Sequence, residues 1–316
     1  MREHSIGGDP ALTLLHAADG KHRGRRLPVL FVHGTTFPSE LASFYRFDGE
    51  SWSDALTDAG FDAWALDFAG YGRSARYPEM AGAPDAVPPL GRVPAAATQI
   101  GRACGYVREQ TGTDRVSIVA HSWGTLAAGR YAASRPEHVE QLVLFGPIAR
   151  REILAEVPNL PAYRDVTLQE QFDRFVEDVP DGHPPVLEDF DRWAARYLAS
   201  DPDAHSRELP NVRIPAGPTA DILGAWAGYF PYDPGAIRAS VLIVRGEWDS
   251  LCKESDANWL KERLSAAAEV SNVVIDRATH LMHLEHGRHE LHAVCTEFLN
   301  RAEAARAPSR IAHQAR

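Results

Sequence analysis

A serine in the surroundings expected of a catalytic nucleophile lies at Ser122, in the stretch from Val119 to Thr125 (VAHSWGT). An apolar run precedes the serine and a helical pattern follows it, so the chain must turn sharply at this point. Small flanking residues keep such a turn from striking the neighbouring strand and helix. However, Ala120 stands where the strict pattern has glycine, and serine is also a common helix N-cap. Ser122 alone is therefore a weak signal that needs partners.

A serine hydroxyl attacks a carbonyl carbon only when a base takes its proton and a third group orients that base. Asp249 and His280 supply these two residue types, and each follows an apolar run typical of a strand. Open α/β sheets build their sites at the carboxyl ends of strands. The order serine, acid, histidine is also the order expected after a strand–turn–helix nucleophile. We therefore predict that Ser122, Asp249 and His280 form a catalytic triad.

Neighbouring residues are alternatives for two of these roles. Glu247 and Asp256 lie close to Asp249 in the sequence, and four further histidines follow His280, namely His283, His286, His289 and His292. Their three-residue spacing resembles a metal-binding helix face, but no acidic or cysteine partner completes a ligand set, so no metal is predicted. His280 is preferred because it comes first after the strand, where a loop can reach Ser122.

Alternating strand and helix patterns predict the elements that position these residues. Apolar runs bounded by glycine and proline predict strands at 28–32, 62–67, 116–120, 141–145, 241–244 and 273–275, with an antiparallel edge strand at 12–16. Helical patterns fall at 51–59, 95–110, 124–134, 256–267 and 289–304. Parallel strands need such crossovers, so we expect a mostly parallel sheet with helices on both faces.

The segment from 148 to 235 interrupts this alternation. It is rich in proline, has helical patterns at 168–176 and 187–198, and shows no strong strand. Its many aromatic residues argue against a disordered linker, so we predict a helical cap at 148–235 inserted into a core formed by 1–147 and 236–316. Trp226, Tyr229 and Phe230, just before the chain returns to the sheet, are the candidates for contacting an apolar part of a substrate.

Composition and charge exclude several classes of function. The formal net charge is −10, and the only tight basic run, Arg23, Arg25 and Arg26, reads as a solvated loop, so no nucleic acid is expected as a partner. Gly70 and Gly72 form a G-x-G without the third glycine of a dinucleotide site, and no cofactor is predicted.

The sequence also bears on location. Three cysteines fit no zinc or redox spacing and read as free thiols of a reducing compartment. The apolar runs are too short to span a membrane, and the first residues lack the apolar core of a secretory signal. We therefore expect a cytoplasmic protein with no membrane partner, and a homo-oligomer is possible.

Taken together, these motifs resemble the α/β-hydrolase family over nearly the full chain. The residues that carry the resemblance are His33-Gly34, Asp67 to Ser74, the Ser122 turn, Gly246 to Asp249, and His280 to Glu285. The resemblance implies an eight-stranded sheet and a cap inserted after the sixth strand. It also implies an oxyanion hole formed by the backbone N–H groups of Trp123 and Thr35, with Thr36 as the alternative to Thr35, and a His33 that supports the loop.

A serine nucleophile favours carbonyl substrates, because family members that cleave haloalkanes and epoxides use aspartate at this place. We expect hydrolysis of a carboxylic ester, lactone or thioester through an acyl-enzyme, acting on a small molecule with an apolar part. The Ser-Trp-Gly sequence also resembles proline iminopeptidases, so an aminopeptidase or amidase is an alternative; its cap acids would be Glu152, Glu156, Glu170, Glu177 and Asp178. A ligand-binding homologue that has lost catalysis is a further alternative.

Overall fold

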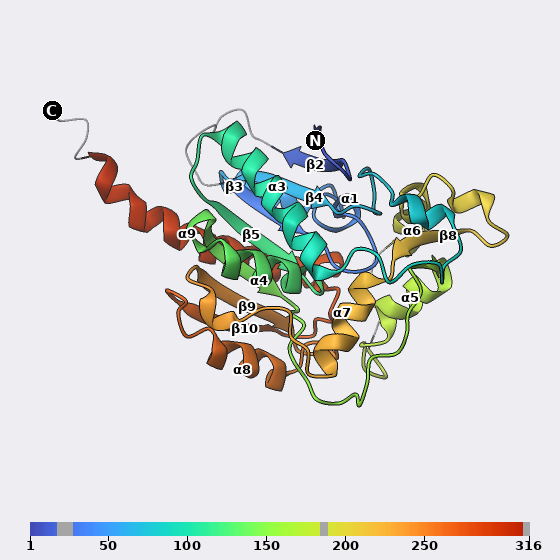
Figure 1. Cartoon of the computed structure of the whole chain (residues 1–316). Coiled ribbons are helices and arrows are strands. Elements are labelled where there is room, and N and C mark those ends of the chain that lie inside the picture. The colour runs from blue at the N-terminus through green and yellow to red at the C-terminus, as the bar shows by residue number, and fades with distance from the viewer. Residues whose placement is uncertain (18–27, 184–188, 312–316) are drawn as a thin grey trace.

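The computed structural model describes residues 1–17, 28–183 and 189–311, so the basic run at Arg23 to Arg26 lies outside the described residues. Its parallel strands are continuous runs of buried residues, as expected for strands covered on both faces. They are β3 (Pro28–Val32), β4 (Asp62–Asp67), β5 (Val116–His121), β6 (Val139–Phe145), β9 (Ser240–Gly246) and β10 (Val270–Ile275). The eight-stranded sheet has the order β1-β2-β4-β3-β5-β6-β9-β10, and the prediction of a mostly parallel sheet is confirmed (Figure 1).

The antiparallel end of the sheet differs from the prediction. Strand β2 (Leu12–Ala17) pairs with β4 as expected, but it is not the edge, because β1 (Arg2–Ile6) pairs outside it. Strand β1 is largely exposed and carries Arg2, Glu3 and His4. Polar residues are typical of edge strands, which must avoid pairing with other chains, and they remove the apolar pattern that would reveal the strand.

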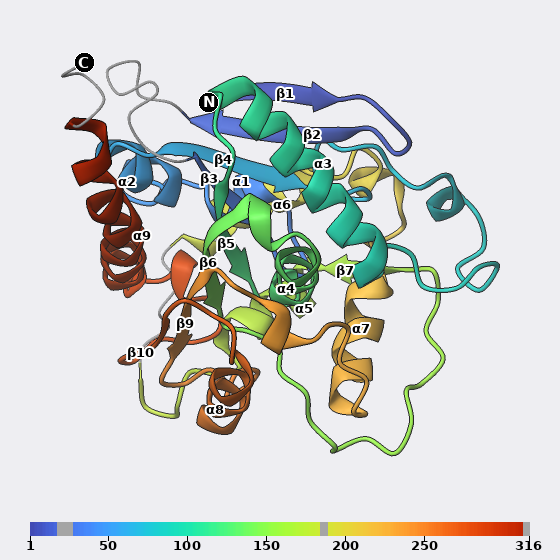
Figure 2. The same cartoon turned by 60° about the vertical axis from the view of Figure 1, so that its left-hand side comes forward.

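Helices cover both faces of the sheet. On one face α3 (Val93–Thr111) packs beside α4 (Gly124–Ser134), and α8 (Glu254–Arg263) contacts β10. On the other face α2 (Trp52–Asp58) packs against α9 (Arg288–Ile311) (Figure 2). Each of the five helices predicted for the core is present, although α9 extends to Ile311 instead of ending at residue 304. A short helix, α1 (Ser39–Ala42), follows the loop after β3.

The insertion lies between β6 and β9 and contains α5 (Leu168–Val176), α6 (Phe190–Ala199) and α7 (Gly217–Trp226), which gather at one side of the sheet (Figure 1). The sequence shows no strong strand in this segment, but β7 (Tyr163–Thr167) and β8 (Asn211–Pro215) form a short antiparallel pair there. Both strands are short, and neither shows the continuous apolar run of the core strands. The 43 residues between Thr167 and Asn211 (168–210) also separate the two partners in the sequence. The cap is therefore mixed rather than purely helical.

Rings from α5 and α6 form the inside of the cap. Phe175 packs edge-on against Trp193, and Trp193 stacks on Tyr197. The Trp193 indole donates a hydrogen bond to the carbonyl oxygen of Leu41 at 3.1 Å. This buried cluster fixes α6 against the short helix α1.

Asp221 of α7 ties the cap to the core. Its buried carboxylate accepts hydrogen bonds from the backbone N–H of Val93 at 2.7 Å and from the indole of Trp123 at 3.1 Å. Val93 begins α3, so Asp221 satisfies an N–H that the helix itself cannot. The cap therefore contacts the residue directly after the predicted nucleophile.

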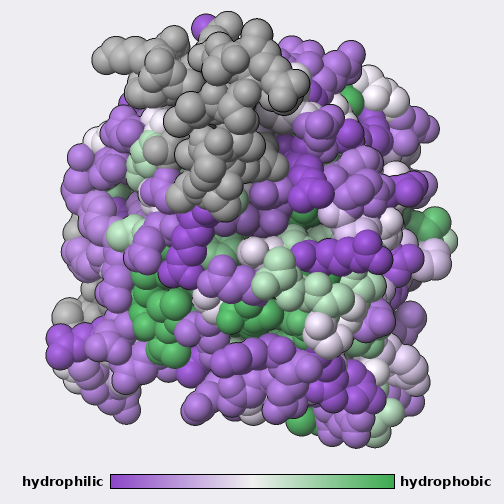
Figure 3. Space-filling view, turned by 90° about the vertical axis from the view of Figure 1, so that its left-hand side faces the viewer, coloured by the Kyte–Doolittle hydropathy of each residue, from purple (hydrophilic) through white to green (hydrophobic). Residues whose placement is uncertain are grey.

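The face of the molecule on the α9 side is mainly hydrophilic. The face on the α9 side carries polar side chains, with hydrophobic residues gathered in a band across its centre (Figure 3). Large exposed hydrophobic residues of the described chain are scattered over several elements, for example Ile153, Leu209, Tyr229 and Val274. No described helix has the length and apolarity needed to cross a bilayer. A homo-oligomer stays a prediction.

Two glycines on α7 allow a matched test of the cap–core junction. A Cβ at Gly217 would lie 2.1 Å from the carbonyl oxygen of Leu90, whereas a Cβ at Gly224 would meet no atom within 4 Å. Gly217→Ala should therefore lower the free energy of unfolding by about 2–3 kcal/mol, since the backbone must shift. Gly224→Ala should raise it by roughly 0.5–1 kcal/mol through helix propensity.

The measurement is urea denaturation of both variants. Equal effects from the two substitutions would contradict the close approach of α7 to the loop before α3.

Candidate active site

The turn at Ser122 has the backbone of a strained nucleophile. Its φ is 55°, a left-handed conformation that costs a residue with a side chain on the order of 1–3 kcal/mol. The Ser122 N–H donates to the carbonyl oxygen of Phe145 at 2.9 Å, and its carbonyl accepts from the N–H of Thr125 at 2.9 Å. These bonds join β5, β6 and α4 around the serine, so the surrounding sheet maintains the conformation.

Glycines next to the turn are needed for clearance. A Cβ at Gly34 would come within 3.1 Å of the Ser122 Cβ, and a Cβ at Gly124 would lie 2.4 Å from the carbonyl oxygen of His33. Ala120 is fully buried in β5 and fits the place where the strict motif has glycine. The small residues expected around the serine are therefore required by packing.

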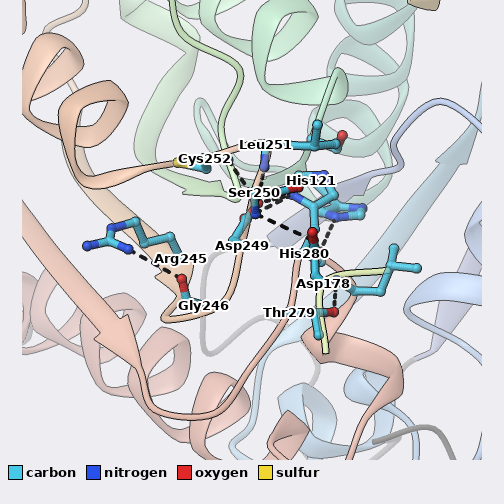
Figure 4. A network of polar contacts seen from close by, with 12 residues as sticks. His121, Asp178, Arg245, Gly246, Asp249, Ser250, Leu251, Cys252, Thr279 and His280 are labelled. Atoms are coloured by element: carbon cyan, nitrogen blue, oxygen red, sulfur yellow. Dashed lines mark hydrogen bonds and ion pairs between the residues drawn. The ribbon is translucent and has the colours of Figure 1, made fainter. Parts of the chain in front are cut away.

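His280 and Asp249 form a buried hydrogen-bonded pair. The His280 Nδ1 lies 2.9 Å from each carboxylate oxygen of Asp249. The Asp249 Oδ1 also accepts from the N–H groups of Leu251 at 2.9 Å and Cys252 at 2.8 Å, which fixes the carboxylate (Figure 4). The Nε2 of His280 is buried and has no hydrogen-bond partner among the described residues. It is the atom that can act as base.

The alternative acids and histidines lie elsewhere. Glu247 accepts a hydrogen bond from the N–H of Arg277 at 3.0 Å, and Asp256 forms an ion pair with Arg151 at 2.5 Å. His283 is buried beside Phe145, and His292 stacks on Trp52. His289 lies near Glu50 on the surface. The geometry therefore favours Asp249 and His280 among the candidates.

The loop after β3 is held in place by His33. Its Nδ1 donates to the carbonyl oxygen of Gly34 at 2.8 Å, and its Nε2 accepts from the N–H of Phe68 at 3.2 Å. Complete burial lowers the pKa of His33 to about 4, so the ring is neutral near pH 7. Tyr71 adds a hydrogen bond to the carbonyl oxygen of Thr35 at 2.7 Å.

Trp123 and Thr35 are the residues whose N–H groups are predicted to bind an oxyanion. Trp123 precedes the first turn of α4, so its N–H has no acceptor within the helix. Thr35 and Thr36 both line the cavity beside Ser122. With the carbonyl of Thr35 fixed by Tyr71, the peptide plane of this loop is held in one orientation. Trp123 thus follows Ser122 directly in the chain, and Thr35 lines the cavity beside Ser122.

Several residues that support the site were missed at the sequence level. Gly146 passes so close to the pair that a Cβ there would lie 2.9 Å from the His280 Cε1. His121 donates from Nε2 to the carbonyl oxygen of His280 at 3.0 Å. Buried Glu285 accepts from the N–H and hydroxyl of Thr279, and burial raises the pKa of Glu285 to about 7. Only the Glu285 position, five residues after His280, gave any signal in the sequence.

A cavity of about 360 Å³ opens onto this site. Ser122, His121 and His280 line it from the core. Its apolar wall consists of Phe37, Val166, Ile222, Leu251 and Leu281, and its polar wall of Arg164, Glu170, Gln171, Asp173, Arg174 and Glu177. The structure thus brings Ser122 and His280 to one space under the cap.

The predicted substrate contacts of the cap lie outside this lining. The Trp226 ring lies beneath the guanidinium of Arg151, and Phe230 packs against Trp259. Tyr229 is 75% exposed. The cap contributes to the cavity through β7, α5 and Ile222 of α7 instead. Among the described residues, no group of three or more His, Cys, Asp and Glu side chains is arranged to hold a metal ion.

The family model of the alpha/beta hydrolase fold matches residues 28–287. The match extends over most of the chain, so the protein belongs to the alpha/beta hydrolase fold family, and the resemblance predicted from the motifs is confirmed. A comparison with curated protein sequences finds no match.

Solved structures of similar fold come from several hydrolases. The thioesterase domain from the curacin biosynthetic pathway aligns with a TM-score of 0.61 and 16% identity, covering 95% of this chain and 99% of that one. The monoacylglycerol lipase of Paleococcus ferrophilus gives 0.59 and 19%, covering 92% and 99%. Est1E from Butyrivibrio proteoclasticus, with ferulic acid bound, gives 0.61 and 17%, covering 95% and 99%. At such identities the likenesses show the fold alone.

Because several histidines are buried in their neutral form, we expect the free energy of unfolding to fall in acid. Burial is the largest cause that lowers the pKa of four rings, His33, His121, His283 and His292; for His292 the value falls to about 3. Below the unfolded value of about 6.5, only the unfolded chain binds these protons, so each histidine lowers the free energy of unfolding by up to about 1.4 kcal/mol per pH unit. Buried Asp67 and Glu285, whose pKa values are raised, offset part of this loss.

The free energy of unfolding should therefore fall as the pH drops from 6.5 to 4.5. His292→Phe removes one such ring, so its slope should be shallower than that of the wild type by about 1.4 kcal/mol per pH unit. Urea denaturation at several pH values measures both slopes. An unchanged slope in the variant would mean that His292 takes up its proton in the folded state.

Proposed function

We propose that the protein is a serine hydrolase that cleaves a carboxylic ester or a related acyl compound, such as a lactone or thioester. The observation that carries the proposal is the Asp249–His280 pair beside the strained Ser122. His280, whose Nε2 has no partner among the described residues, lines the same cavity as Ser122. Family membership supports it, and so do the esterase, lipase and thioesterase named among the similar structures.

The reaction begins when Ser122 attacks the carbonyl carbon of the substrate. His280 takes the hydroxyl proton at Nε2, while Asp249 holds the Nδ1–H and stabilises the imidazolium that forms. The carbonyl oxygen becomes an oxyanion that accepts hydrogen bonds from the N–H groups of Trp123 and Thr35. The tetrahedral intermediate then collapses, and the alcohol or thiol leaves with the proton from His280.

Water completes the cycle. It attacks the acyl-enzyme while His280 again takes a proton, and the carboxylic acid leaves as Ser122 regains its hydrogen. The apolar wall of Phe37, Val166 and Leu281 fits a substrate with an apolar part. Such a small-molecule role needs no cofactor, and the expected cytoplasmic location stays a prediction.

The aminopeptidase alternative has less support. It needs a free carboxylate to hold the ammonium group of the substrate. Two of the five suggested acids, Glu170 and Glu177, line the cavity, but Glu170 caps α5 and Glu177 pairs with Arg174. The carboxylates of the cavity therefore already have partners.

The acid of the triad can be tested with a matched pair of variants. Asp249→Asn should lower kcat for p-nitrophenyl acetate by roughly 10⁴-fold, because the histidine loses its preferred tautomer. Glu247→Gln, which changes the neighbouring acid, should keep the wild-type rate. Steady-state hydrolysis is the measurement, with circular dichroism as the control for folding. The reverse pattern would transfer the role of the acid to Glu247.

A further inference from the structure

The cap end of the cavity is lined by two arginines and three carboxylates, and one of the arginines forms no ion pair with a described residue. Arg164 and Val166 are two residues apart on β7, so both side chains lie on the same face of the strand and line the cavity. Helix α5 and the residue after it contribute the other charged residues of this wall. The residues that line the cavity from the core side include no Asp, Glu, Lys or Arg. Selectivity for a charged substrate must therefore come from this wall of the cap.

The carboxylates of this wall are engaged by other groups. Glu170 accepts from the N–H of Thr167 at 2.7 Å in a capping box. Asp173 accepts from the amide of Gln169 at 2.8 Å. Glu177 forms an ion pair with Arg174. These contacts account for every carboxylate of α5 that lines the cavity.

Arg174 is also paired. Besides Glu177, its guanidinium lies 3.5 Å from the buried carboxylate of Asp178. Two acids therefore pair with Arg174, although its Nη2 is buried without a hydrogen-bond partner among the described residues.

Arg164 has no such partner. It forms no ion pair with a carboxylate of the described residues, and its Nε is buried without a hydrogen-bond acceptor. Arg164 lines the same cavity as Thr35 and Thr36 of the loop after β3. Tyr71 holds the Thr35 carbonyl at 2.7 Å. The unpaired charge therefore shares this cavity with the predicted oxyanion loop.

Gln171 is a second unsatisfied group in the same wall. Its side chain is 1% exposed, and neither its amide nitrogen nor its amide oxygen has a partner in the described residues. A buried amide without hydrogen bonds costs about 1–3 kcal/mol, so a ligand that satisfies it gains affinity. Arg164 and Gln171 both line the cavity that contains Ser122.

We propose that Arg164 and Gln171 form a carboxylate subsite, so that the substrate is an ester whose acyl or alcohol part carries a carboxylate. The inference rests on the proposed ester hydrolysis and adds a substrate class to it. The guanidinium fork matches a carboxylate, and one unpaired cation balances its single charge. The cavity is at the small end of ligand sites, which run from roughly 300 to 1,000 Å³, so it fits a compact monoester.

Paired substrates test the subsite. The acyl arm compares 4-nitrophenyl hydrogen glutarate with its methyl ester, and the alcohol arm compares 4-acetoxybenzoate with its methyl ester. In one arm the wild type should prefer the carboxylate in kcat/KM by roughly 10- to 100-fold. Arg164→Gln should reduce that ratio to near one, whereas Arg196→Gln, outside the cavity, should keep it.

A binding measurement separates this inference from the proposed function. Ser122→Ala is titrated calorimetrically with monomethyl glutarate, 4-hydroxybenzoate and inorganic phosphate, and then again with Arg164→Gln added. At least one carboxylate should bind more tightly than phosphate, and its affinity should fall roughly 10-fold or more in the double variant.

If any of the four esters is cleaved, the ratio of kcat/KM values tests the carboxylate subsite. If none is cleaved, the proposed ester hydrolysis fails, and the titration alone tests the subsite. A preference for the methyl esters, a carboxylate preference that survives Arg164→Gln, or tighter binding of phosphate would overturn the carboxylate subsite.

Discussion

The left-handed backbone of Ser122 is the constraint on which the site depends. Side chains avoid this conformation, so the fold must hold it, and it does so through the bond to Phe145 and the helix that starts at Gly124. The same turn places Trp123 at the start of α4, where its N–H has no acceptor within the helix. In the proposed mechanism, this one strained residue is the nucleophile, and the residue after it supplies one of the two N–H groups of the oxyanion hole.

The remaining groups reach this turn from distant parts of the chain. Asp249 and His280 follow neighbouring parallel strands, so the topology brings them together before any local contact forms. Buried supports then fix the His280 loop, with His121 bonded to its carbonyl and Glu285 bonded to Thr279. The cap is fixed to the same region through Asp221, which contacts the Trp123 indole.

The core of the fold and the ends of its strands could be predicted because buried parallel strands leave continuous apolar runs in the sequence. The strand at Arg2 to Ile6 could not, since an exposed edge strand is polar. Asp249 and His280 could be predicted for the same reason, because each directly follows one of these apolar strands.

The walls of the cavity were not predictable in this way. Trp226 and Phe230 were chosen for their aromatic rings, but those rings pack against Arg151 and Trp259. Arg164 and Gln171 line the cavity because β7 pairs with β8 and α5 follows it directly. Such positions depend on how the cap folds over the core, which no local pattern in the sequence records.

The proposed hydrolysis requires that Ser122 is a reactive nucleophile, and covalent labelling with a fluorophosphonate measures this directly. The wild type should gain the mass of a single adduct, located on the peptide that contains Ser122, and Ser122→Ala should gain none. An unlabelled wild type, or an adduct that persists in Ser122→Ala, would contradict the central claim and favour a protein of this fold that only binds its ligand.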